Sequence, residues 1–300
     1  MDQHTAPLEF EGRLSKGKDW REIVAWVGDL PPMPQTASRA VRLVEDPNTD
    51  ASQLSKVLEM DTALAARVLK IANSAMFCRQ REITTLQQAI MIIGLKSLKG
   101  IIVAATIQQM NKSMSKIQKI IWENSICTAI AATIITKKLR YPYVDELFLL
   151  GLLHSLGQIV LATQTELTKG YLQVLQLIKE RHLDYVNAEQ EVFGFAHPLI
   201  GALVAKKWNF PGDSCQIILH YKDPVESFSS EIEQDKKAMI IQLADMLCHH
   251  AGLGSPEGYF TDERKIELLQ EKLNLSPKEA PTEIIQETSR HFRDERHLYE

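Results

Sequence analysis

The sequence predicts an all-α protein, a bundle of many helices joined by short loops. Apolar residues recur at helical spacing along most of the 300-residue chain, and no convincing stretch alternates between polar and apolar residues as a half-buried strand does. Glycine and proline number only 14 and 12, which favours helices over a turn-rich β fold. With 45% hydrophobic residues, a chain of this length can bury a large core without disulfides.

The N-terminal part begins with a polar segment and two short helices. Residues 1–19 are polar and are expected to be flexible, and residues 20–27 predict a short helix that stops before a proline-rich segment. The next helix is predicted over 36–46. It ends at Asp46 because the residue before a proline is pushed out of the α region.

Three polar residues mark the starts of the following helices. Each can accept a hydrogen bond from a backbone N–H of the first turn, and they are Asp50, Asp61 and Thr85. Gln53 and Gln88 stand three residues after the first and the last of them, which is the spacing of a capping box. Gly94 supplies a stop signal for the helix that Thr85 begins.

From residue 95 onward the chain predicts longer and more apolar helices. Their expected ranges are 95–110, 115–140, 145–156, 158–164, 168–181, 188–193, 198–208, 213–221 and 230–250, followed by helices that begin at Asp262 and Ser276. The stretch 147–165 has no charged residue, but it contains polar residues such as His154 and Gln158. We therefore predict a buried core segment there and not a membrane span.

The chain divides into four predicted parts. They are a flexible N-terminus over 1–19, an N-terminal helical subdomain over 20–114, a second helical subdomain over 115–252 and a C-terminal helical extension over 253–300. The boundary between the two subdomains is expected in the polar gap at 110–116.

Charge and cysteine content argue against several classes of function. The chain has 34 basic and 38 acidic residues, a net charge of −4, so no global positive field favours a nucleic acid partner. Its cysteines contain no CxxC pair and are expected to be buried, reduced thiols of a cytoplasmic protein; they are Cys78, Cys127, Cys215 and Cys248. The N-terminus lacks the apolar core of a signal peptide, and no membrane partner is expected.

Four polar residues stand within apolar surroundings in separate helices. They are His154, His197, His220 and Asp245. A single histidine of this kind is usually a hydrogen-bonded core residue, because an unpaired polar group is costly there. Four of them favour a shared metal or a water-filled pocket, since helices can bring such side chains together. No short ligand spacing such as HxxxH links them, so both interpretations stay open.

Two further motifs have a functional and a structural interpretation. Residues 89–103 have the form of a helix-turn-helix, but the second helix is apolar where a DNA-reading helix is polar and basic, so we expect no DNA binding. His249 stands four residues after Asp245 on the same helix face. The two form either a ligand pair or, as we expect, a capping pair near the end of the helix.

Several segments occur in the order that is typical of one family. They read LPPMPQTASRAVRLVEDPNTDASQLSKVLEMDTALAARVLKIANSAMF, ITTLQQAIMIIGLKSLKGIIVA, IWENSICTAIAATIITKKL, LFLLGLLHSLGQIVL and EVFGFAHPLIGALVAKKWNFP. From Leu30 to about Tyr221, the chain strongly resembles the HDOD domain, the HD-related output domain of bacterial signalling proteins. The resemblance implies an HD-like helical bundle, with 115–252 as the HD-like subdomain, in a bacterial protein.

HDOD domains are similar in fold to HD-domain phosphohydrolases, including the HD-GYP enzymes. Those enzymes hold divalent metals that lower the pKa of a bound water. The His-Asp pair of their name matches His154-Ser155 here, and a hydroxyl is a poor substitute for a carboxylate. The first family histidine matches Asn124, whose amide oxygen binds a transition metal less well than imidazole does. The resemblance places His197, His220 and Asp245 at later ligand positions.

The resemblance therefore implies a non-catalytic signalling module that acts by binding a protein partner or a nucleotide and needs no cofactor. The alternative is a metal-dependent HD-type phosphohydrolase with a variant site. In that case zinc, iron or manganese would be held by His154, His197, His220 and Asp245. Lys137 or Lys138 would then contact a substrate phosphate.

Overall fold

The computed structural model describes residues 32–74, 83–110, 115–163, 165–275 and 280–299, and the regular elements in these ranges are all helical, as predicted. They are α2 (Gln35–Glu45), α3 (Ala51–Glu59), α4 (Thr62–Ala72), α5 (Leu86–Ile93), α6 (Leu95–Met110), α7 (Lys116–Lys138), α8 (Val144–Leu153), α9 (Leu156–Thr163), α10 (Thr165–Arg181), α11 (Tyr185–Phe193), α12 (His197–Lys207), α13 (Gly212–His220), the 3-10 turn η3 (Val225–Ser227), α14 (Glu233–His250), α15 (Glu263–Lys272) and α16 (Ala280–Tyr299). The predicted flexible segment 1–19, the helix over 20–27, Cys78 and the start signal at Ser276 lie outside the described residues.

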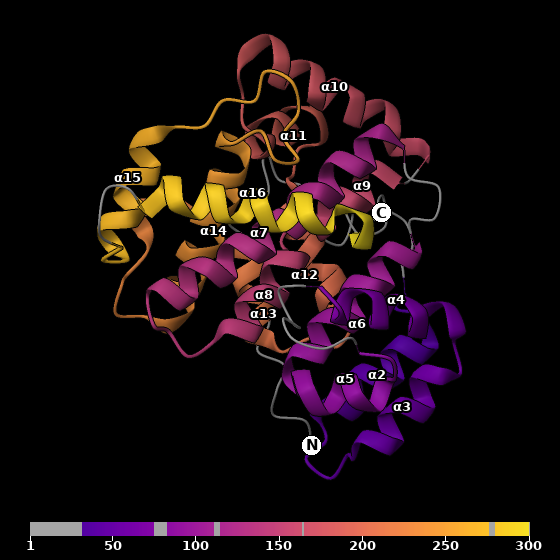
Figure 1. Ribbon diagram of the computed structural model, residues 1–300. Helices are drawn as coiled ribbons and strands as arrows, with labels where there is room; N and C mark the ends of the chain where they lie inside the picture. The colour runs from indigo at the N-terminus through magenta and orange to yellow at the C-terminus, as the bar shows by residue number, and fades with distance from the viewer. Residues whose placement is uncertain (1–31, 75–82, 111–114, 164, 276–279, 300) are drawn as a thin grey trace, which may run out of the picture.

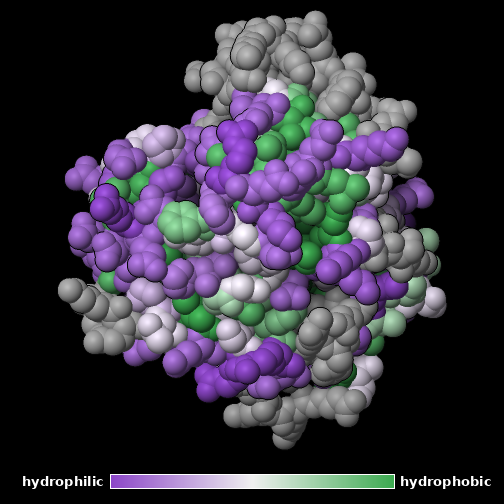
Figure 2. All heavy atoms as spheres, turned by 90° about the horizontal axis from the view of Figure 1, so that it is seen from above, coloured by the Kyte–Doolittle hydropathy of each residue, from purple (hydrophilic) through white to green (hydrophobic). Residues whose placement is uncertain are grey.

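Helices α2–α6 gather at one end of the molecule, and α10 and α11 lie at the other (Figure 1). Between them, α7 packs against α8, α14 and α16, and α12 packs against α9 and α13. Helix α16 crosses the front of α7 in the view of Figure 1. Figure 2 looks down on the end that carries α10 and shows apolar atoms among a mostly polar surface. The helices around α7 and α14 hold the buried polar residues described below.

The predicted caps of α3 and α4 are confirmed. The Asp50 carboxylate accepts the Gln53 N–H at 2.7 Å, and the Gln53 side chain accepts the Asp50 N–H at 3.1 Å, which completes a capping box. Asp61 accepts the Leu64 N–H at 3.0 Å and so begins α4. Both carboxylates satisfy backbone donors that the helix leaves unpaired.

The capping box predicted for α5 forms only in part. Thr85 accepts the Gln88 N–H at 3.1 Å, as predicted. The Gln88 side chain, however, accepts the backbone N–H of Thr84 at 2.9 Å instead of that of Thr85. Gly94 ends the helix with a φ of +83°, a conformation that favours glycine.

The apolar segment after Asp145 breaks earlier than predicted. Helix α8 ends at Leu153 and α9 begins at Leu156, so His154 and Ser155 form the turn between them, while Gly157 lies inside α9. Gly157 allows α9 to approach α12 very closely, because a Cβ on it would stand 2.0 Å from the carbonyl oxygen of His197. This approach brings the His154 turn beside the start of α12.

Two more helices begin before their predicted starts. Helix α10 begins at Thr165, and α11 begins at Tyr185 because Asp184 caps it by accepting the Asn187 N–H at 2.8 Å. One stretch, Val144–Thr163, is long and apolar enough to cross a membrane, but 89% of its most apolar window is buried inside the protein. It is a core segment, as the uncharged sequence predicts.

The second helix of the apparent helix-turn-helix is packed on most sides. Residues 101–108 of α6 are buried. Lys99 is paired with Glu45 at 2.5 Å, and Ser97 donates to Asp145 at 2.5 Å. A helix with these contacts has little polar surface left to present to a DNA groove.

Candidate functional site

Asp245, in the middle of α14, is the centre of a buried polar cluster. Its side chain is buried, and the residue is 1% exposed. Oδ1 lies 3.4 Å from His154 Nε2 and 3.3 Å from His249 Nε2. Oδ2 accepts a hydrogen bond from the ammonium of Lys222 at 2.5 Å. Three nitrogen-bearing side chains from separate parts of the chain therefore meet at one carboxylate.

The electrostatics of the cluster keep Asp245 and Lys222 charged. Burial disfavours the charged form of both side chains. The attraction between the two opposite charges is stronger than this effect. Lys222, helped by the two imidazoles, holds the pKa of Asp245 well below its usual value, and Asp245 raises the pKa of Lys222 well above its usual value. Burial lowers the pKa of His249 to about 4, so this imidazole is neutral at pH 7.

His154 joins the turn after α8 to α7 and α14. Its Nδ1–H donates to the carbonyl oxygen of Gly151 at 2.6 Å, which turns Nε2 toward the other side. There, Nε2 lies 3.0 Å from Oδ1 of the buried Asn124 and 3.4 Å from Asp245. His154 is therefore oriented by its own helix end and directed at the carboxylate.

Ser155 points its hydroxyl at another serine. It is fully buried, and its Oγ is hydrogen-bonded to Oγ of Ser125 on α7. Ser125 donates to the carbonyl oxygen of Ile121 at 2.9 Å, so Ser155 donates to Ser125. The residue after His154 thus takes part in a neutral hydroxyl chain and brings no charge to the cluster.

His197 sits in a second set of buried polar groups. Its Nδ1–H donates to Glu189 Oε2 at 2.6 Å, and its Nε2 lies 2.6 Å from the hydroxyl of Tyr221. Burial raises the pKa of Tyr221 well above its usual value, so the phenol keeps its proton within its hydrogen bond to Nε2. Glu189, His197 and Tyr221 form a continuous hydrogen-bonded chain.

Aromatic rings join the two sets. The Tyr221 ring meets the His154 ring edge-on, with 5.4 Å between centroids. Tyr259, from the loop after α14, stacks on His249 at 4.2 Å, and Tyr185 lies 5.8 Å from the same imidazole. His249 is therefore enclosed by Asp245 and two tyrosines, so its pairing with Asp245 lies in the buried cluster and is not the ordinary capping pair expected from the sequence.

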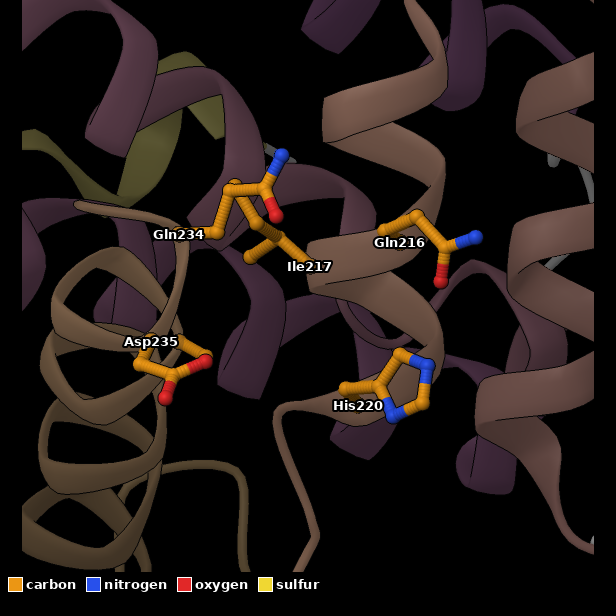
Figure 3. A pocket seen from close by; sticks show the side chains of 6 residues that line it. Gln216, Ile217, His220, Gln234 and Asp235 are labelled. Carbon is orange, nitrogen blue, oxygen red and sulfur yellow. The ribbon is translucent and has the colours of Figure 1, made fainter. Parts of the chain in front are cut away.

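His220 lies apart from the cluster. Its side chain is 38% exposed, and Nδ1 is 2.8 Å from Asp223 Oδ2. It lines a shallow hollow of about 230 Å³ between α13 and α14, which Gln216 and Asp235 also line (Figure 3). The structure thus brings His154, Asp245 and Asn124 together and joins His197 to them through Tyr221, but it does not bring in His220. Lys138 is paired with Glu283 of α16 at 2.7 Å.

Several residues of the cluster were not singled out from the sequence, although helical spacing contains their signal. Lys222 follows the buried Ile218 by four residues, and Tyr221 follows the buried Ile217 in the same way. Glu189 lies four residues after Tyr185 in a stripe that continues to Phe193. Lys222 and Glu189 are thus charged residues at helical spacing from buried apolar residues. This pattern in the sequence indicates their buried contacts.

The donor set does not fit a divalent metal. Within the described ranges, no three or more histidine, cysteine, aspartate or glutamate side chains are arranged to hold one. A metal bound to Asp245 Oδ2 at about 2.0–2.2 Å would lie beside the Lys222 ammonium, which already contacts that oxygen. Two cations at one buried oxygen would repel each other.

Comparisons with known proteins give one family and a set of similar folds. The family model for the HDOD domain matches residues 30–224. An HDOD domain protein of unknown function from Geobacter sulfurreducens is 24% identical, with a TM-score of 0.73, over 93% of this chain and 95% of that one. A protein of Shewanella amazonensis, named as a candidate metal-dependent phosphohydrolase, is 21% identical, with a TM-score of 0.64, over 91% of this chain and 93% of that one.

Two further similar proteins are longer than this chain. A candidate signal transduction protein of Marinobacter aquaeolei is 20% identical, with a TM-score of 0.66, over 96% of this chain and 63% of that one. An uncharacterised protein of Treponema pallidum is 23% identical over 216 residues, which are 70% of this chain and 41% of that protein. The chain thus spans less than half of this curated relative. At these identities, the likeness to solved structures concerns the fold alone.

Proposed function

The chain belongs to the HDOD domain family, and from this premise we propose that it is a non-catalytic signalling module. It acts by binding a protein partner or a nucleotide, and it does not turn over a phosphoester. The proposal places it in the bacterial cytoplasm.

The observation that carries the proposal is the neutral Ser155–Ser125 contact beside His154. In HD-type phosphohydrolases, the residue after this histidine is an aspartate that binds metal. Here the position holds a buried hydroxyl that is committed to Ser125. The position of the first family histidine holds Asn124, whose amide oxygen faces His154. Two groups on which metal-activated water would depend are therefore replaced, the aspartate by an uncharged hydroxyl and the imidazole by a weaker amide ligand.

The second candidate function is a metal-dependent phosphohydrolase with a variant site. It is favoured by the two imidazoles that face Asp245 Oδ1 and by the name of the Shewanella amazonensis protein. In that case, His154 and Asp245 would be needed for turnover. The Lys222–Asp245 contact argues against it, for the reason given above.

Hydrolysis assays separate the two candidates. We would measure the release of nitrophenol from bis-p-nitrophenyl phosphate, and the loss of cyclic dinucleotides, with Mn²⁺, Fe²⁺ or Zn²⁺ added in turn. The proteins would be the wild type, His154→Ala and His250→Ala, a matched control at an exposed position of α14. We expect no metal-dependent turnover that distinguishes the wild type from His154→Ala. Turnover that is lost in His154→Ala and kept in His250→Ala would overturn the proposal.

A binding role also has a direct measurement. Cyclic dinucleotides and mononucleotides would be titrated into the wild type while its unfolding temperature is followed, because a ligand that binds the folded state raises it. A saturable rise identifies the nucleotide as the signal. If no nucleotide raises the unfolding temperature, the proposal requires that the signal is a protein partner.

A further inference from the structure

We infer that the ammonium of Lys222 is the resident cation of the buried cluster and stands at Oδ2 of Asp245 in place of a divalent metal. This inference does not depend on the proposed signalling function. It rests on the position of Lys222, on the charges around Asp245 and on the mismatch between the donor set and a metal.

Lys222 reaches the cluster from the end of α13. Its side chain is only 13% exposed, and Nζ donates to Asp245 Oδ2 at 2.5 Å. Nζ also lies 5.4 Å from the centroid of the Tyr221 ring, whose face attracts a cation. The ammonium of Lys222 thus lies near an aromatic ring and contacts the buried carboxylate.

The groups that face Asp245 supply its charge balance. His249 presents its imidazole to Oδ1 of Asp245 at 3.3 Å, and the rings of Tyr259 and Tyr185 lie against that imidazole. His154 faces Oδ1 from the turn after α8. Among the described side chains in contact with Asp245, Lys222 is the one that brings an ammonium, which lies 2.5 Å from Oδ2.

The second buried carboxylate has partners of its own. Glu189 Oε2 accepts two hydrogen bonds from His197, which in turn contacts Tyr221. Asp245 therefore depends on Lys222, because an ionised carboxylate with no cation is strongly unfavourable inside a protein. A metal added at Oδ2 of Asp245 would have to displace the ammonium.

The test is a double-mutant cycle on Lys222 and Asp245. Lys222→Met removes the charge and keeps most of the stem, and Asp245→Asn removes the opposite charge. We expect each single variant to unfold at a clearly lower temperature than the wild type. We expect the double variant to unfold at a higher temperature than either single variant, because neither charge is then left alone.

Lys237 provides the matched control. It is also a buried lysine, on α14, but it is paired with Glu146 and Glu233 at 2.9 Å and not with Asp245. Lys237→Met is expected to lower the unfolding temperature, and Asp245→Asn should not restore it. Equal rescue of both lysine variants, or no rescue of Lys222→Met, would overturn the inference. If Lys222→Met does not fold alone, a folded double variant supports the inference and an unfolded one overturns it.

A metal titration of the wild type gives an independent answer. Zn²⁺ and Mn²⁺ would be added to protein that was purified with a chelator, and bound metal would be measured by mass spectrometry after dialysis. We expect less than 0.1 equivalent bound and no rise in unfolding temperature. One equivalent that is lost in Asp245→Asn would overturn the inference. A third outcome separates the two proposals. If Asp245→Asn rescues Lys222→Met and the wild type binds no metal but still hydrolyses phosphodiesters, the proposed function is overturned and this inference stands.

Discussion

Glu189 and His197 form a buried pair in which one carboxylate oxygen receives two hydrogen bonds from the same residue. Oε2 accepts the backbone N–H of His197 at 2.7 Å and its ring Nδ1–H at 2.6 Å. Because His197 is the first residue of α12, the contact fixes the start of the helix and the orientation of the imidazole together. The other ring nitrogen is then directed at Tyr221.

The first prediction concerns this pair. Glu189→Gln keeps the shape of the side chain but replaces the charged acceptor, and it directs an amide into a fully buried site. We expect a loss of about 1–3 kcal/mol in the free energy of unfolding, measured by urea denaturation. Glu191→Gln on the same helix is the control, since Glu191 is exposed and paired with Arg181. Its effect should stay within about 0.5 kcal/mol, and similar effects of the two variants would contradict the prediction.

The second prediction concerns the contact between α9 and α12. A Cβ at position 157 would meet the carbonyl oxygen of His197 at 2.0 Å and the backbone nitrogen of Gly201 at 2.8 Å. Gly157→Ala should therefore push the two helices apart and lower the free energy of unfolding by about 3 kcal/mol, the upper end of the usual range for overpacking.

Gly212→Ala is the control for this substitution. A Cβ there would meet nothing within 4 Å, and Gly212 is the first residue of α13. The change should be neutral or stabilise the protein by up to about 1 kcal/mol. The same urea series measures both variants, and a tolerated alanine at 157 would show that α9 and α12 do not pack at backbone contact.

The third prediction is a loss of stability in mild acid that depends on His249. Its pKa is about 4 in the folded protein, against 6.5 for an unperturbed histidine, and burial is the main cause. The unfolded chain therefore binds this proton first. The His249 contribution is fully present above pH 6.5 and is lost as the pH falls toward 4. A pKa shift of this size corresponds to about 3 kcal/mol in the free energy of unfolding.

His249→Phe should remove this dependence, because phenylalanine keeps the stacking on Tyr259 but does not titrate. Urea midpoints at pH 7.5, 6 and 5 measure the slope for both proteins. The lowered pKa of Asp245 affects stability at lower pH. Its contribution to the free energy of unfolding is lost only below about pH 3.8, the ordinary pKa of the group. Equal slopes for wild type and variant between pH 7.5 and 5 would contradict the prediction.

Much of the fold is predictable from local signals. The caps at Asp50 and Asp61 and the stop at Gly94 act within a few residues, so the sequence contains all that is needed to find them. The break at His154 and Ser155 is different. It depends on the close approach of α9 to α12 at Gly157, which brings together residues far apart in the chain.

The candidate site is predictable only in part for the same reason. His154 and Asp245 stand out because they are polar residues in very apolar segments, and the structure does bring them together. His220 stands out equally, but α13 presents Tyr221 and Lys222 to the cluster and leaves His220 half exposed. Which residue at the end of a helix faces inward depends on the rotation of that helix against its neighbours.

The last prediction tests whether a carboxylate at position 155 makes an enzyme. Ser155→Asp restores the His-Asp pair in the sequence, but it places a carboxylate in a fully buried site whose neighbour is the Ser125 hydroxyl. Asn124 and Lys222 remain as they are. We expect no metal-dependent phosphodiester hydrolysis and a loss of about 3–5 kcal/mol in the free energy of unfolding, because the new charge has no cation of its own.

Ser230→Asp, at an exposed position, controls for the added charge and should change the free energy of unfolding by no more than about 0.5 kcal/mol. Urea denaturation gives the stabilities, and nitrophenol release with Mn²⁺ gives the activity. If Ser155→Asp hydrolysed the ester only with metal present, the Lys222 ammonium would have to be displaceable. The site would then be one residue away from a phosphohydrolase, which the buried Lys222–Asp245 contact argues against.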